Sequence, residues 1–259
     1  TPIERLSAWA GLQFFRSLLV DPALCQQANQ PNILTWPEGL GLLGQRMSQL
    51  LPAEKKRSRN HVLRLEDRGD HVWALVHDGK RNRSYSLKAR HAVFAAPKMQ
   101  VYNIIPQLEA AGRDEFAELH YVSWMVAAVH FRKLPEFPGG RIGWDNLLHG
   151  SWTLGYINNQ HQEIPRRSPD KRHVVSLYAA FPYDTKAERT EMLTYGWDYW
   201  ARMFLHELQK GHPGVDALIE RMDIWKWGHP MRQTSVGSVF GSQRQKMLQA
   251  FVRLHFAHS

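Results

Sequence analysis

Residues 61–97 read HVLRLEDRGDHVWALVHDGKRNRSYSLKARHAVFAAP, and this stretch decides the fold class. Two apolar runs, 62–65 and 72–76, flank Arg68-Gly69-Asp70, a signal for a β-hairpin. Asp78-Gly79-Lys80 predicts a second turn, followed by a strand over 83–87. A small apolar strand over 91–96 is predicted to stop at Pro97, because proline cannot donate to a strand ladder.

The rest of the chain alternates between the two kinds of element. Runs rich in β-branched and aromatic residues predict strands at 126–131 and 173–181, with further strands at 153–157, 223–227 and 252–259. Apolar residues at helical spacing predict helices at 3–19, 42–51, 184–210, 215–222 and 243–250. The predicted fold class is therefore mixed α and β.

The segment 184–210 gives the clearest helical pattern. Thr185 and Glu188 have the spacing of a capping box, and Gly211 and Pro213 follow the segment. Its predicted buried stripe consists of Leu193, Trp197, Trp200, Phe204 and Leu208.

The composition and charge of the chain limit the kinds of partner that the sequence supports. The chain has 259 residues, 43% of them hydrophobic, and no apolar run of the roughly 20 residues that span a bilayer. Its net charge is +9, with basic clusters at 55–59, 80–83 and 166–167. Each cluster lies beside a turn signal, so solvated loop charge is the first interpretation. We expect no nucleic-acid partner, because no RNA-binding aromatic signature or zinc finger is present.

Several kinds of site are not indicated. The single cysteine, Cys25, excludes an internal disulfide and a cysteine-rich metal site. His255 and His258 would project to opposite faces of a strand, so no metal site is predicted. A G-x-S-x-G motif is absent, which leaves serine hydrolase chemistry unsupported.

Three stretches together resemble the flavin-dependent amine oxidase superfamily, in particular its bacterial FAD/NAD(P)-binding amine oxidase domain proteins. Residues 34–43, LTWPEGLGLL, are similar to the family's P-x-G-G-x-x-x-L turn, although Leu40 displaces the second glycine. Residues 92–97, AVFAAP, resemble the strand that returns to the dinucleotide domain, and 227–231, WGHPM, a late strand entering the substrate cavity. The segments 143–147, 154–156 and 254–259 strengthen the match, which spans nearly the whole chain.

The resemblance implies an FAD cofactor and a set of residues near it. These are Gly39, Leu40, Gly41, Val62, Ala95, Ala96 and Pro97. Glycine at 39 and 41 would let the backbone approach the flavin, and the resemblance places the loop in one cleft with Ala96. The alternative is that both glycines form a tight turn, Val62 is a sheet residue, and Ala95–Pro97 only finish a strand.

Trp144, Tyr156, Trp227 and His229 are the predicted substrate-binding residues. Trp225 and Trp227 are two apart, so a strand projects both to one side, and His229 continues that side. An aromatic face with an imidazole suits an amine or an aromatic ring, and we predict a concave surface shared with Trp144 or Tyr156. The alternative is a core face with a hydrogen-bonded histidine.

The first residues, Thr1-Pro2, and the final strand-like run lead us to expect an internal segment of a larger oxidoreductase. Residues 1–35 and 99–222 would form a substrate-binding domain of mixed sheet and backing helices. Residues 36–98 and 223–259 would form part of an FAD-binding domain. The dinucleotide-binding half of that domain is expected to be missing. We therefore expect the segment alone to bind FAD poorly and to be inactive.

The resemblance implies that the parent protein oxidises an amine or a related small molecule by hydride transfer to flavin. The competing interpretation is a non-catalytic basic protein that binds anionic lipid or nucleic acid. The residues identify no catalytic base, and they leave open the substrate, the electron acceptor, the oligomeric state and whether the compartment is cytoplasm or periplasm.

Overall fold

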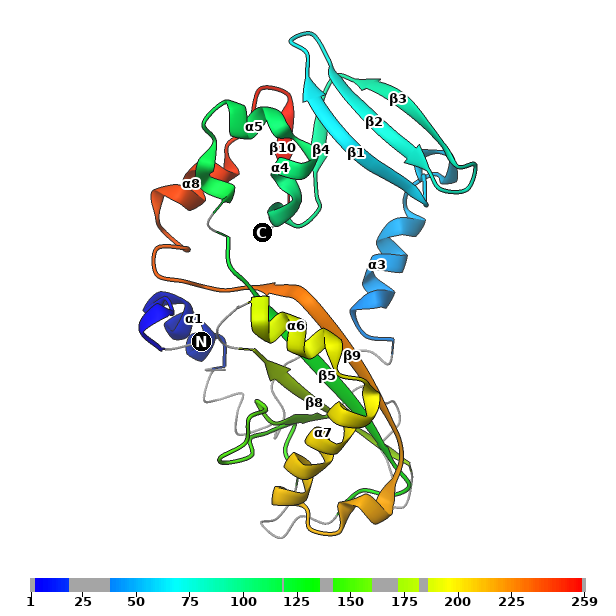
Figure 1. The fold of residues 1–259 in the computed structure, drawn as a ribbon, viewed down its shortest axis with the longest axis vertical. Coiled ribbons are helices and arrows are strands. Elements are labelled where there is room, and N and C mark those ends of the chain that lie inside the picture. Colours follow the sequence, from blue (N-terminus) through cyan, green and yellow to red (C-terminus); the bar gives the residue numbers. More distant parts are fainter. Residues whose placement is uncertain are drawn as a thin grey trace. The chain divides into compact units, whose positions relative to one another are not determined.

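A computed structural model describes residues 3–18, 38–117, 119–135, 142–159, 172–181 and 186–257. It mixes helices and strands, which confirms the predicted fold class (Figure 1). The predictions for Cys25, 34–37, Thr185 and His258 fall outside the described residues.

The chain packs into two compact units. The first, which we call the large-sheet unit, contains residues 121–231 and takes in parts of 1–48. The second, the meander unit, contains 5–11, 49–120 and 232–259. These limits differ from the predicted domains, since 99–120 group with the meander unit and 223–231 with the large-sheet unit. The roles assigned to the two domains stay predictions.

The large-sheet unit is built on five strands in the order β6-β7-β8-β5-β9. Their bounds are β5 Tyr121–Phe131, β6 Asp145–Asn146, β7 Tyr156–Asn158, β8 His173–Ala180 and β9 Ile219–Arg232. β5 pairs antiparallel with the whole of β8, from Trp124 opposite Ala180 to Phe131 opposite His173. The predicted strands at 126–131 and 173–181 are therefore confirmed.

Two helices pack on this sheet, α6 (Lys186–Thr194) and α7 (Trp197–Gly211), and both lie across its strands in Figure 1. The single helix predicted over 184–210 is wrong, because the helix breaks at Tyr195-Gly196. Carbonyl groups at the end of α6 accept side-chain hydrogen bonds instead. Lys226 Nζ donates to the backbone oxygens of Leu193 at 3.2 Å and Tyr195 at 2.9 Å. These bonds satisfy carbonyl groups that find no donor within the helix at its C-terminal end.

Three of the five residues in the predicted buried stripe are buried. Trp200, Phe204 and Leu208 are at most 4% exposed and form the core with the sheet, whereas Leu193 is 53% and Trp197 54% exposed. The predicted helix over 215–222 is also wrong. A short 3-10 turn, η6 (Val215–Leu218), gives way to β9 at Ile219, because pairing with β5 overrides local helical preference.

The meander unit begins with a three-stranded antiparallel sheet of β1 (Asn60–Asp67), β2 (Val72–Asp78) and β3 (Arg83–Ala89). Both predicted turns are confirmed, and Gly69 adopts φ +89°, a conformation that glycine permits. β4 (Ala92–Phe94) pairs in parallel with β10 (Leu254–Phe256). Short helices complete the unit: η2 Ala53–Lys55, η3 Lys98–Gln100, α4 Val101–Ile104, α5 Pro106–Ala110, η4 Asp114–Phe116 and α8 Ser242–Leu248.

A separate core holds the meander unit together. Leu65 and Val72 from the three-stranded sheet and Phe94 and Leu254 from the parallel pair share one cluster with the α4 and α5 residues Val101, Ile105 and Leu108. The predicted helix at 243–250 is confirmed as α8, and its Met247 is 1% exposed in the same cluster.

The N-terminal helices differ from these cores. Residues 3–19 were expected to form one helix, but a 3-10 turn, η1 (Ile3–Arg5), precedes α1 (Ala8–Leu18). The helix α3 (Leu40–Gln49) confirms the prediction over 42–51, yet none of its residues is buried. Its apolar side chains are exposed, with Leu43 at 46% and Met47 at 61%.

Candidate functional site: an aromatic sheet face

The two faces of the large sheet differ in burial, and this difference defines the candidate site. Along β5 from Met125 and along β8 from His173, every second residue is buried and the residues between are partly exposed. The partly exposed set includes Trp124 on β5 and Tyr178 on β8. Because alternate residues point to opposite sides of a sheet, both rings lie on the face turned away from the buried core.

β9 extends this face at the edge of the sheet. Arg132 N donates to Leu218 O at 2.9 Å, and Ser123 Oγ donates to Gly228 O at 3.0 Å, so β9 runs antiparallel beside β5. Trp225 and Trp227 are 47% and 42% exposed, and His229 is exposed as well. The intervening residues 224, 226 and 228 are more buried, which confirms that the three rings share one side of the strand. We call Trp124, Tyr178, Trp225, Trp227 and His229 the aromatic face.

Ring contacts and one carboxylate fix part of this face. The rings of Trp124 and Tyr178 are nearly parallel, with centroids 6.1 Å apart and 12° between planes. The Tyr178 hydroxyl donates to Asp145 Oδ1 at 2.8 Å. Burial, together with this carboxylate, raises the pKa of Tyr178 above its usual range, so the phenol stays neutral and remains a donor.

The backbone between Trp227 and His229 is held by two donors. Gly228 O accepts from Ser123 Oγ at 3.0 Å and from Arg189 Nε of α6 at 2.9 Å. Arg189 also donates to Tyr121 O at 3.3 Å, which ties α6 to the same end of β5. The strand that carries Trp227 is therefore positioned from both neighbouring elements.

The aromatic face becomes polar toward the other end of the strands, where His130 Nε2 lies 3.2 Å from Asp223 Oδ2. Exposed indole rings attract flat apolar groups, and their negative π-faces attract cations. The arrangement can thus bind and orient an aromatic or amine-bearing molecule. It contains no group able to accept a hydride, so any redox step needs a cofactor.

Two predicted substrate residues, Trp227 and His229, lie together on the aromatic face. Tyr156 does not: it is 0% exposed, on the helix-covered face, and its hydroxyl lies 2.7 Å from His212 Nε2 of the segment after α7. The expectation that Tyr156 shares a surface with Trp227 is corrected, because its partner across the ladder, Leu177, belongs to the buried set. Trp144 is partly buried beside the short β6.

Sequence reasoning missed Trp124 and Tyr178. The signal was present in the alternation of 121–131 and 173–180, since both rings fall on the positions between buried neighbours. What the sequence lacks is the register that sets Val126 opposite Tyr178.

The predicted cofactor residues are divided between the units. Gly39 has φ +61° and precedes α3, whereas Gly41 lies within that helix, so only Gly39 needs a conformation suited to glycine. Leu40 is 79% exposed. These three residues group with the large-sheet unit, and the expectation of one cleft shared with Ala96 stays a prediction.

In the meander unit, Val62 pairs with Val76 in the three-stranded sheet and is 42% exposed. Ala95 and Ala96 are exposed, and Pro97 follows them at the carboxyl end of β4. β10 runs parallel to β4, and the carboxyl ends of parallel strands are where nucleotide cofactors usually bind. Small side chains leave the backbone accessible there.

Lys98 is a further feature of this region that the sequence did not indicate. It follows Pro97, opens η3 and is only 3% exposed. Burial, together with Arg232 and Arg244 nearby, lowers the pKa of Lys98. An anion beside it would compensate this charge. Small residues and a buried cation fit the approach of a pyrophosphate group. The G-x-G-x-x-G spacing itself occurs elsewhere, at Gly39, Gly41 and Gly44 at the start of α3.

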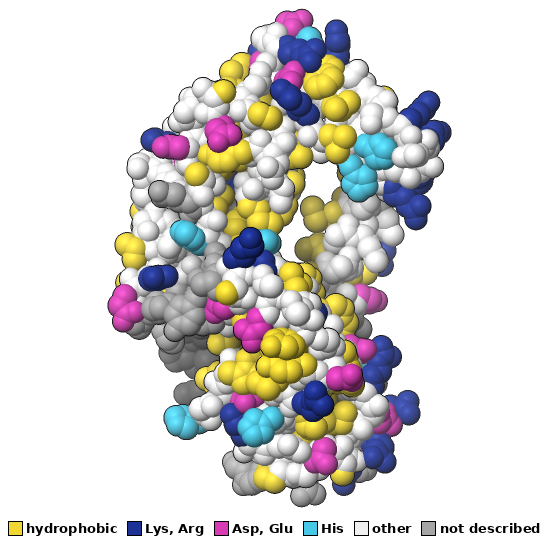
Figure 2. Space-filling model, in the orientation of Figure 1, with side chains coloured by type: hydrophobic (Ala, Val, Ile, Leu, Met, Phe, Trp, Pro, Cys, Tyr) yellow, Lys and Arg dark blue, Asp and Glu magenta, His cyan; other side chains and the backbone are white. Residues whose placement is uncertain are grey.

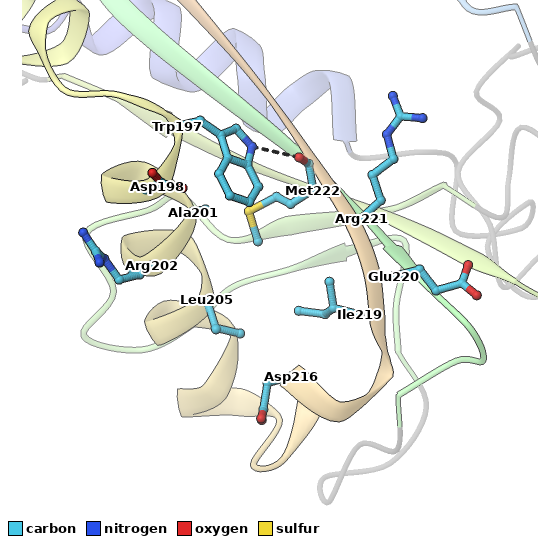
Figure 3. A pocket seen from close by; sticks show the side chains of 10 residues that line it. All are labelled: Trp197, Asp198, Ala201, Arg202, Leu205, Asp216, Ile219, Glu220, Arg221 and Met222. Carbon is cyan, nitrogen blue, oxygen red and sulfur yellow. Dashed lines mark hydrogen bonds between the residues drawn. The ribbon is translucent and has the colours of Figure 1, made fainter.

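A separate hollow of about 720 Å³ lies between α7 and the start of β9 (Figure 3). Trp197 forms one wall, and its indole Nε1 donates to Met222 O at 2.9 Å. Charged side chains, including Asp198, Arg202 and Glu220, line it as well. This hollow does not belong to the aromatic face, because α7 packs on the opposite side of the sheet.

Two findings concern membranes and metals. Across the described ranges, no helix is both long and apolar enough to cross a bilayer. No cluster of three or more His, Cys, Asp or Glu side chains suited to a metal ion occurs in the part of the chain that the structure describes.

Comparisons with known proteins show which solved structures share this fold. No protein family model matches the chain, and no curated protein matches its sequence. Among solved structures, it is similar to cyclohexylamine oxidase from Brevibacterium oxydans IH-35A, with a TM-score of 0.62 and 14% identity over 85% of this chain and 47% of that chain. It is also similar to a CLA-producing fatty acid isomerase from P. acnes, with a TM-score of 0.58 and 14% identity over 93% of this chain and 51% of that chain. The chain thus has the fold of about half of each structure.

Proposed function

We propose that this chain supplies the substrate-binding sheet and part of the flavin-binding region of an FAD-dependent oxidoreductase of the amine oxidase type. The aromatic face carries this proposal, because exposed Trp225 and Trp227 are costly to leave in water unless they contact a ligand or a partner. The sequence resemblance to flavin amine oxidases and the structural likeness to cyclohexylamine oxidase support the same assignment from independent directions.

Each part of the chain has a role in this proposal. Bound FAD would accept a hydride from the carbon that carries the amine. Trp225 and Trp227 orient the substrate and exclude water, while Ser123 and Arg189 hold the strand between the rings. Ala95, Ala96 and Lys98 would lie near the cofactor's phosphates.

The test uses the full-length natural protein that contains this chain. We expect it to carry a yellow flavin and cyclohexylamine or benzylamine to bleach the flavin spectrum under anaerobic conditions. A polyunsaturated fatty acid serves as the second arm, since one similar structure is a fatty acid isomerase. Conversion of the fatty acid without reduction by amines would reject the amine proposal, and a colourless protein unable to bind added FAD would reject the flavin.

The 259-residue chain alone provides a further check. It matches only 47% of the similar oxidase chain, so we expect weak FAD binding or none in a titration followed by flavin fluorescence. Sub-micromolar binding would show that the residues in this chain are sufficient for the cofactor.

A further inference from the structure

Two basic clusters that are far apart in the sequence converge at one end of the three-stranded sheet. Lys56 and Arg57 precede β1, while Lys80, Arg81 and Arg83 belong to the β2–β3 turn and the start of β3. Antiparallel pairing brings them together, because Asn60 lies opposite Asp78 and Asp78 lies opposite Arg83. Figure 2 shows Lys and Arg side chains gathered at this end of the sheet.

These residues line a hollow of about 760 Å³, which we call the basic hollow. Sites for small molecules commonly have volumes of about 300–1,000 Å³. Five cationic side chains and one acidic side chain line it, which leaves a formal charge of +4. Charges of one sign gathered in a hollow repel one another, and a bound anion would reduce this repulsion.

The one acidic residue of the lining forms an ion pair with only one of the five cations, Arg81. Asp78 is 4% exposed, and its Oδ1 accepts from the backbone N–H groups of Lys80 at 3.0 Å and Arg81 at 3.3 Å. Its Oδ2 accepts from the Arg81 guanidinium at 3.2 Å. These bonds hold the pKa of Asp78 below its usual value despite its burial, so the carboxylate shapes the turn.

Neutral donors and an aromatic ring complete the lining. The Tyr85 hydroxyl donates to Asn60 Oδ1 at 2.6 Å and accepts from Arg57 at 3.2 Å, and the guanidinium carbon of Arg57 lies 5.9 Å from the ring centroid. Ser58 and Ser84 add hydroxyl groups. Guanidinium, ammonium and hydroxyl donors around a hollow are the groups that bind phosphate oxygens.

We propose that the basic hollow binds a small molecule or headgroup carrying two or more phosphate groups. A concave site with a net charge of +4 matches a compact polyanion better than an extended one. The proposal concerns the outer end of the meander sheet and does not depend on the flavin or on the aromatic face.

The test measures binding of tripolyphosphate to the 259-residue chain by calorimetry. Vesicles with and without a phosphorylated inositol lipid form a second arm, and a single-stranded oligonucleotide forms a third. We expect saturable binding of tripolyphosphate or of the inositol-lipid vesicles, weakened by added salt. Binding of tripolyphosphate identifies a soluble ligand, and binding of the vesicles alone identifies a headgroup.

The variant Lys80→Gln/Arg83→Gln should weaken this binding about tenfold or more, because it removes two of the five cations while leaving the Asp78 bonds to the backbone. Lys133→Gln/Arg202→Gln loses the same charge elsewhere and is the matched control. Thermal melting establishes that each variant is folded. No binding of either phosphate probe, equal loss in the control, or binding of the oligonucleotide alone would overturn the proposal.

Discussion

The two faces of the large sheet use the same strands for different purposes. On one face, Met125, Ala127, Val129 and Phe131 are fully buried under α7 with Val175, Leu177 and Ala179. On the other, the more exposed positions of β5, β8 and β9 carry three tryptophans, a tyrosine and two histidines. Burial on the first face stabilises the fold, whereas the second keeps large aromatic area accessible. Under the proposed function, one face provides stability and the other binds the substrate, and substitutions can test that division.

The largest effect is expected for Phe204→Ala, on the buried face. Phe204 is 0% exposed and contacts Trp152, with ring centroids 5.2 Å apart. Removing a buried phenyl ring typically costs about 3–5 kcal/mol of unfolding free energy. Urea denaturation measures this loss. Leu193→Ala on α6 is the control, since Leu193 is 53% exposed and should lose less than about 1 kcal/mol. Similar losses in both variants would contradict the assignment of the core.

Tyr156→Phe should have an intermediate effect on the same face. The substitution keeps the ring but removes the hydroxyl that lies 2.7 Å from His212 Nε2, a residue only 3% exposed. Loss of a partner to a buried polar atom costs about 1–3 kcal/mol. The matched variant is Tyr178→Phe, whose hydroxyl bonds to exposed Asp145 and should cost less. Equal costs would mean that the two faces do not differ in polarity.

Alkaline pH should reveal the buried phenols. Burial raises the pKa of Tyr156, Tyr178 and Tyr102 above the ordinary value, so the folded state favours the neutral form. Their stabilising contribution is complete below the unfolded pKa of about 10 and is lost as pH rises beyond it. Melting temperatures should therefore fall above that pH, and less steeply in Tyr156→Phe. An unchanged slope in that variant would show that Tyr156 ionises as easily in the folded protein as in the unfolded chain.

Local patterns in the sequence were enough to predict the meander sheet. Gly69 and Gly79 mark its turns within a few residues of the strands they join, so no long-range information is needed. The break between α6 and α7 could not be predicted, because Leu193 and Trp197 continue the helical spacing of the true core residues. The break falls at Gly196, the N-cap of α7, and Lys226 on a distant strand bonds to the carbonyls of Leu193 and Tyr195 there.

Part of the candidate site could also be predicted, because that part depends only on local patterns. The two-residue period within β9 is local, so Trp227 and His229 were placed on one side correctly. Tyr156 was misassigned because its face depends on its pairing with Leu177. Trp124 and Tyr178 join Trp227 only through the strand order β8-β5-β9, which no local pattern contains.

Trp227→Ala should have the smallest effect on stability and a clear effect on function. Trp227 is 42% exposed, so its truncation removes less buried area than that of Phe204 and should cost about 1 kcal/mol or less. Under the proposed function, kcat/KM for an amine should fall in the full-length protein because the substrate loses an aromatic contact, while the spectrum of the bound flavin is retained. Trp197→Ala is the control, since Trp197 is similarly exposed at 54% but belongs to α7 and not to the aromatic face. Turnover and melting temperature measured on both variants separate the two roles. If Trp227→Ala lost several kcal/mol with unchanged turnover per folded molecule, the aromatic face would be structural, and the division between the two faces would fail.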